Sequence, residues 1–76
     1  MVSAAAEWDE LNARLDLARD ALHDLHEQIT TTGTVYQNGG KFKYLANMRT
    51  TVTVAAGLLD EVAVMAAAGE QAEGGH

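Results

Sequence analysis

The chain has 76 residues, enough for one small domain, with a formal net charge of −6 and neither Cys nor Pro. The lack of Cys excludes disulfides and thiolate metal sites, and the lack of Pro leaves long helices uninterrupted. The longest uninterrupted apolar run, residues 62–68, is far shorter than the roughly 20 residues of a membrane span. Residues 1–8 lack the basic and apolar regions of a signal peptide. We therefore expect a cytoplasmic protein with no membrane contact.

Charge is unevenly distributed along the chain. Residues 1–27 contain seven acids and two Arg, residues 28–59 contain three bases and no acid, and residues 60–76 contain four acids and no base. An acidic protein does not bind nucleic acid through its bulk charge, but a local basic segment could do so. The same segment could instead attach to the acidic end of a neighbouring molecule.

The N-terminal part predicts an amphipathic helix over about residues 3–31. Its apolar residues recur at alternating intervals of three and four, the heptad pattern of a helix that packs along another helix. They are Trp8, Leu11, Leu15, Ala18, Leu22, Leu25 and Ile29. Ser3 is a suitable N-cap, and Gly33 is a suitable residue for the C-terminal end.

Residues 34–44 predict a short β-hairpin or an extended tip. Residues 34–37 and 41–44 alternate in polarity and contain many β-formers, and Asn38-Gly39 between them is typical of a tight hairpin turn. An isolated two-stranded hairpin is marginally stable in water, so this tip must pack against the helices.

A second heptad pattern predicts a helix over about residues 44–68. It comprises Leu45, Met48, Val52, Ala55, Leu59, Val62 and Ala66, and its register continues through the β-branched residues 50–54 and through Gly57. Gly69 is expected to end this helix, and residues 70–76 are expected to form a disordered tail. A further apolar stripe, Val54, Leu58 and Met65, lies beside the heptad row.

Together these elements predict an all-α protein, an antiparallel two-helix hairpin that forms one domain over residues 1–69. The stripe Val54, Leu58 and Met65 has no partner within such a hairpin, so we expect it to form the interface of a homo-oligomer.

The sequence has no signature of catalysis. His23, Asp24, His26 and Glu27 are close together, but the second predicted helix has no His to complete an inward-facing metal site, so a solvated polar face is the favoured interpretation. No nucleophile–base pair or phosphate-binding loop is present. We expect no enzyme activity, metal, cofactor or small-molecule substrate.

The predicted tip is the best candidate for a binding surface. It combines cations, which contact phosphates, with aromatic rings, which stack on bases. The residues are Tyr36, Lys41, Phe42, Lys43, Tyr44 and Arg49. The alternatives are a protein partner, or a structural role in which the rings pack on the helices and the Lys stems cover them.

Residues 22–62 resemble the C-terminal half of the small terminase subunits of tailed phages. The resemblance consists of a helix over residues 22–29, the glycine-containing segment 33–40 and the apolar helix over residues 45–62. Asn47-Met48 stands where that family often has Pro, and no room is left before Trp8 for the family's DNA-binding region.

The resemblance implies a non-catalytic oligomeric scaffold for DNA packaging in the host cytoplasm. It also implies weak contact with viral DNA and regulation of a large ATPase–nuclease subunit. The alternative function is an antitoxin-like or adaptor-like helical hairpin that binds a basic partner through its acidic faces.

Overall fold

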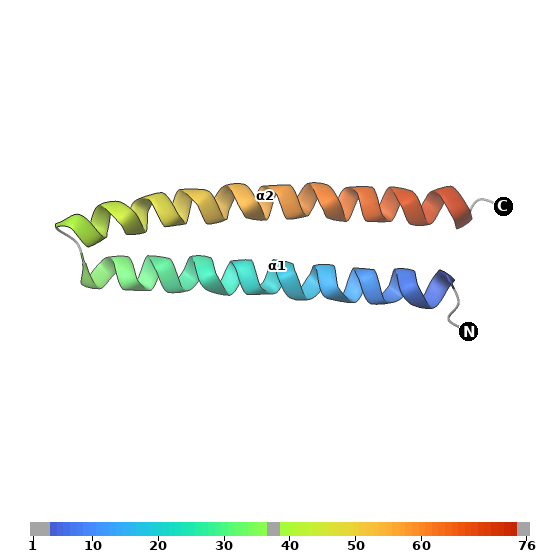
Figure 1. Ribbon diagram of the computed structural model, residues 1–76, viewed down its shortest axis with the longest axis horizontal. Coiled ribbons are helices and arrows are strands. Elements are labelled where there is room, and N and C mark those ends of the chain that lie inside the picture. The colour runs from blue at the N-terminus through green and yellow to red at the C-terminus, as the bar shows by residue number, and fades with distance from the viewer. Residues whose placement is uncertain (1–3, 37–38, 75–76) are drawn as a thin grey trace.

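Two long antiparallel α-helices form the molecule (Figure 1). The computed structural model describes residues 4–36 and 39–74, in which α1 is Ala4–Val35 and α2 is Gly40–Gly74. A short connection joins the helices at one end, which we call the tip, and the two termini lie together at the other, which we call the open end. The predicted all-helical hairpin is confirmed. The molecule is flat and elongated, 58 × 21 × 13 Å.

The predicted β-like tip is wrong, because both helices extend into it. α1 continues through Gly33 to Val35, and residues 41–44 belong to α2. The Tyr36 backbone N–H donates to the carbonyl of Thr32 at 3.3 Å, and Gly39, with a φ of 101°, provides the left-handed conformation of the turn. Each residue added to an existing helix gains a backbone hydrogen bond, whereas two short isolated strands are marginal. Gln37 and Asn38 lie outside the described residues.

α2 also continues beyond its predicted end. Gly69 does not stop it, and residues 70–74 of the predicted tail are helical, while Ser3, the predicted N-cap of the first helix, lies outside the described residues. Gly69 instead faces Trp8: a Cβ built on it would lie 2.8 Å from Cη2 of the indole. The glycine therefore makes room for the indole ring at the open end.

The β-branched residues of α2 are accommodated by local hydrogen bonds. The hydroxyls of Thr50, Thr51 and Thr53 donate to the carbonyls four residues earlier, at 3.1, 2.9 and 2.9 Å. Such bonds satisfy a threonine hydroxyl within a helix. The β-branched residues 50–54, which on their own favour a strand, are therefore compatible with the continuous helix.

The contact between the helices uses half of each predicted heptad pattern. One row of each pattern is buried or half-buried between the helices: Trp8, Leu15, Leu22 and Ile29 in α1, and Leu45, Val52, Leu59 and Ala66 in α2. In the other row, Leu11 is 49% exposed, Leu25 44%, Met48 48% and Val62 44%. Ala55 of that row is half-buried, but its large side chains, which were predicted to face the other helix, are exposed, and this part of the prediction is wrong.

The rotation of the two helices explains the difference. Half-buried neighbours flank the buried row on both sides, with more of them toward one side: Asn12, His26, Gly33, Ala56 and Ala63 lie on that side, and Thr32, Ala55 and Gly69 on the other. A helix with one neighbour covers only one line of side chains, so the second heptad row is left outside the contact.

Leu15 tests whether the buried row holds the hairpin together. Leu15→Ala should lower the free energy of unfolding by about 2–5 kcal/mol, the usual cost of truncating a buried Leu. Leu17→Ala is the control, since Leu17 is exposed on the outer side of α1, and should change it by less than about 0.5 kcal/mol. Urea unfolding followed by circular dichroism measures both, and equal effects would contradict the assignment of the buried row.

Two glycines of α2 test the packing of Trp8. Gly57→Ala should stabilise the protein by about 0.5–1 kcal/mol, because alanine favours the helix and a Cβ at Gly57 meets nothing within 4 Å. Gly69→Ala should lose that gain, because its Cβ displaces the indole of Trp8. Thermal unfolding and tryptophan fluorescence measure both variants. An unshifted emission maximum in Gly69→Ala would show that the indole does not pack on Gly69.

Candidate interaction surfaces

The flat hairpin has two broad faces of different character. Successive residues of a helix are about 100° apart, so residues on the two sides of the buried row point to opposite faces. Exposed apolar side chains from both helices share one of these faces, which we call the apolar face. Its residues are the exposed Leu11, Ala18, Leu25, Tyr44, Met48, Leu58 and Val62, together with the half-buried Ala55.

The predicted interface stripe adjoins this face. Val54, Leu58 and Met65 are all exposed and continue the apolar face around the outer side of α2. The second heptad row and the extra stripe were separate patterns in the sequence, but the rotation of α2 joins them into one surface. The sequence contained the signal for this surface, and the missing information was which heptad row the hairpin itself would bury.

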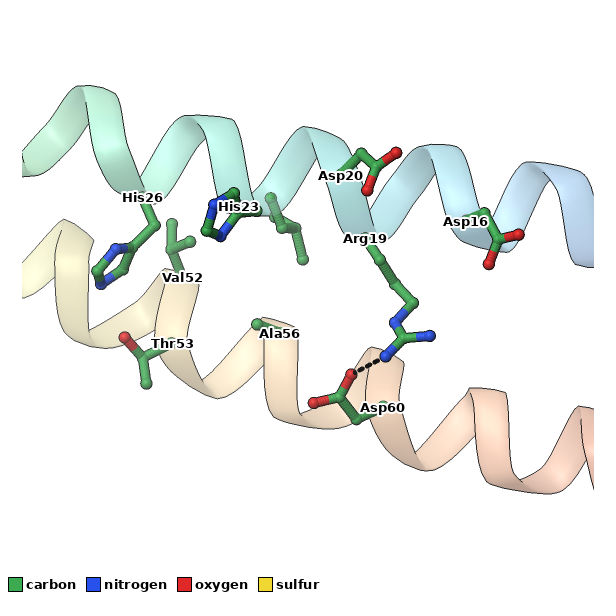
Figure 2. A pocket seen from close by; sticks show the side chains of 10 residues that line it. Asp16, Arg19, Asp20, His23, His26, Val52, Thr53, Ala56 and Asp60 are labelled. Atoms are coloured by element: carbon green, nitrogen blue, oxygen red, sulfur yellow. Dashed lines mark hydrogen bonds and ion pairs between the residues drawn. The ribbon is translucent and has the colours of Figure 1, made fainter.

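The opposite face, which we call the polar face, carries a groove between the helices. The groove has a volume of about 610 Å³ and is lined mainly by charged and polar side chains (Figure 2). Across it, Arg19 Nη2 donates to Asp60 Oδ1 at 2.9 Å, and this is the one ion pair between the helices in the described part of the chain. Both side chains are about half exposed or more, so the pair contributes less than about 1 kcal/mol.

Acidic side chains dominate the surroundings of this ion pair. Asp16 and Asp20 also line the groove, so its lining has three carboxylates and one guanidinium, and Asp60 is the carboxylate that contacts Arg19. His26 leans from α1 toward α2 and is half-buried, whereas His23 is exposed and its Nε2 lies 3.1 Å from Glu27 Oε1 on the same helix. Within residues 4–36 and 39–74, no group of three or more His, Asp or Glu side chains is arranged so that it could hold a metal ion. The polar face is therefore an open, acidic surface.

The predicted tip residues do not form one surface. Phe42 and Arg49 line a hollow beside Gly33 on the polar face. Tyr36, Lys41 and Tyr44 line another hollow, which borders Met48 on the apolar face.

Within the second hollow, Lys41 Nζ lies 4.9 Å from the centre of the Tyr36 ring, a cation–π contact. Lys43 precedes the half-buried Leu45 by two residues, or about 200° of helix rotation, so it points away from α1. The three cations of the tip therefore point in different directions.

α2 is long and apolar enough to cross a membrane by length and composition alone. The candidate stretch is residues 40–72, its mean hydropathy reaches 1.6, and only 6% of the most apolar window is buried. The longest uninterrupted apolar run, residues 62–68, did not indicate a possible span, because Asp60 and Glu61 divide the apolar residues of α2 into two parts. On insertion scales an ionised carboxylate near the bilayer centre costs about 2.5–3.5 kcal/mol, so these two acids oppose a span.

The chain matches no family model, no curated protein and no solved structure. Its function is therefore assigned from its surfaces: an apolar face along both helices, an acidic groove on the opposite side, and a basic tip divided between them.

Proposed function

We propose that this chain is a non-catalytic assembly subunit that works as an oligomeric scaffold and binds further copies of itself through its apolar face. The main support for the proposal is the exposure of the apolar side chains. Among the described residues only Leu15, Ile29 and Ala66 are buried, while most of the large apolar side chains are exposed. A domain this small needs a disulfide, a metal or an oligomer to reach normal stability. The chain has no Cys, so assembly is the most direct source of the missing burial.

The narrower role is DNA packaging, with a large ATPase–nuclease subunit as partner. The resemblance of residues 22–62 to small terminase subunits supports it. The tip would make the DNA contact, since Lys41, Lys43 and Arg49 lie within a stretch that has no acid. Three cations in one chain give weak binding, but an oligomer repeats them, and each neutralised phosphate adds to the salt dependence.

The polar face supports a second candidate, an adaptor that binds a basic partner. Asp16, Asp20 and Asp60 line one open groove, and Arg19 is the single cation among its lining residues. A cationic segment of a partner could lie along this groove and displace the exposed Arg19–Asp60 pair at little cost. Both candidate functions include the oligomeric scaffold, and they differ in which surface binds the partner.

Two valines of α2 test the scaffold. Val62→Glu places a carboxylate on the apolar face and should convert the oligomer to a lower mass, because burying an unpaired charge is costly. Val64→Glu, two residues away on the other side of the helix and 70% exposed, should leave the mass unchanged. Light scattering at tens of micromolar measures both. A monomeric mass for the unmodified chain would contradict the scaffold function itself.

The tip and the groove are tested by two sets of variants. Replacement of Lys41, Lys43 and Arg49 by Ala should abolish salt-sensitive DNA retention, with Arg14→Ala as the control that keeps it, in a mobility-shift assay. Replacement of Asp16, Asp20 and Asp60 by Asn should abolish binding of an oligolysine probe. DNA retention without probe binding supports the packaging role, and the reverse supports the adaptor. Failure of both leaves a scaffold with neither narrower role.

A further inference from the structure

We propose that the apolar face binds the same face of a second copy with the two hairpins reversed, so that each tip lies over the open end of its partner. The inference rests on the proposed scaffold function and gives the assembly a defined geometry. The product is a four-helix bundle made of two hairpins, in which both polar faces point outward.

The broad side of the hairpin is large enough for a stable pair when its ends take part as well as its uncharged middle. The outline of the whole hairpin in the plane of its two helices, 58 Å by 21 Å, is roughly 1,200 Å², against about 800 Å² per partner in a standard stable interface. From Leu11 to Leu25 on α1, and from Tyr44 to Val62 on α2, the residues that form the face carry no charge. Arg14, at its margin, is paired with Glu10 of its own helix at 3.1 Å. Contact between two such faces would therefore bury no unpaired charge.

The heptad patterns point to a second hairpin as the occupant. Each helix has two heptad rows, and the hairpin covers one of them. In a four-helix bundle every helix has two neighbours, and both rows of each helix face the common core. Leu11, Ala18 and Leu25 on α1, with Met48, Ala55 and Val62 on α2, are the rows that a second copy would cover.

Charge complementarity selects the orientation. The tip half of the hairpin, residues 28–52, contains Lys41, Lys43 and Arg49 and no acid, and of these cations Lys41 borders the apolar face, in the hollow beside Met48. The open end, residues 4–13 and 61–72, contains no base and five acids: Glu7, Asp9, Glu10, Glu61 and Glu70. Placing tip on tip would bring together like charges at both ends of the bundle. The reversed arrangement brings opposite charges together at both ends, which favours it electrostatically.

A lipid bilayer fits the same surface less well. The most apolar part of α2 contains Asp60 and Glu61, and Asp60 is paired with Arg19 on the polar face. Insertion of α2 would break this pair and bring both carboxylates into the hydrocarbon region. Pairing with a second copy covers the apolar face and leaves Asp60, Glu61 and the groove in water.

Single introduced cysteines can report the orientation, because the chain has none of its own. With the hairpins reversed, α2 packs on α2 of the partner, and positions equally far from the middle of the helix meet. Thr51 and Val62, six and five residues from the central Gly57, come within one residue of such a pair, and both point toward the apolar side of α2. If the tips instead lay together, α1 would pack on α2 of the partner, and Thr51 would meet Leu25.

The experiment mixes pairs of single-cysteine variants and treats them with a thiol cross-linker that spans about 10 Å, the usual separation of packed helices. We expect a product from Thr51→Cys with Val62→Cys and none from Thr51→Cys with Leu25→Cys. Within one helix Thr51 and Val62 are roughly 16 Å apart, so a partner with its tip at the same end cannot give this product. The proportion cross-linked at low protein concentration should fall as salt is raised, because salt screens the charges at the two ends.

The remaining outcomes separate the orientation from the scaffold. A product from Thr51→Cys with Leu25→Cys would show tips together and overturn the orientation while the scaffold stands. A dimeric mass with neither product would overturn the use of this face. A monomeric mass in water would overturn the scaffold as well, and flotation of that monomer with phosphatidylcholine vesicles would identify lipid as the occupant.

Discussion

A helix that has a single neighbour can cover only one line of its side chains, and this limit determines the character of the whole molecule. α1 and α2 each carry two heptad rows, but the hairpin covers one row on each. The uncovered rows lie on the same side because antiparallel helices turn corresponding positions toward the same face. The hairpin is therefore apolar on one face and polar on the other, and its lack of a closed core and its exposed apolar face have the same origin.

The sequence predicted the parts of the fold that depend on repeated local patterns. The spacing of Leu15, Leu22 and Ile29 predicted α1, and that of Leu45, Val52 and Leu59 predicted α2 and their contact. The sequence did not predict which heptad row would stay outside the contact between α1 and α2, because the heptad pattern is the same for a two-helix and a four-helix assembly. The slight rotation of the helices, visible in the half-buried Asn12, His26, Ala56 and Ala63, is a property of the packed pair.

The errors at the ends of the helices have a common physical cause. Gly33, Gly69 and the alternating residues 41–44 were interpreted through local preferences, which for a glycine or a β-former amount to about 1 kcal/mol. Continuing a long helix gains backbone hydrogen bonds residue by residue and outweighs these preferences. Gly69 also has a packing role with Trp8, a contact between residues 61 positions apart that no local pattern could reveal. The tip candidates are neighbours in sequence, but helix rotation separates Phe42 and Arg49 from Tyr36 and Tyr44.

The groove around Arg19 and Asp60 has a consequence for valency. In a two-fold pair joined through the apolar faces, the two acidic grooves lie back to back and open in opposite directions. One rigid partner domain could not occupy both at once. Two separate partners could, which would make the pair a bridge, and a partner with several basic segments would be drawn into an extended network. Avidity would then depend on the length of the linkers between those segments rather than on the affinity of one groove.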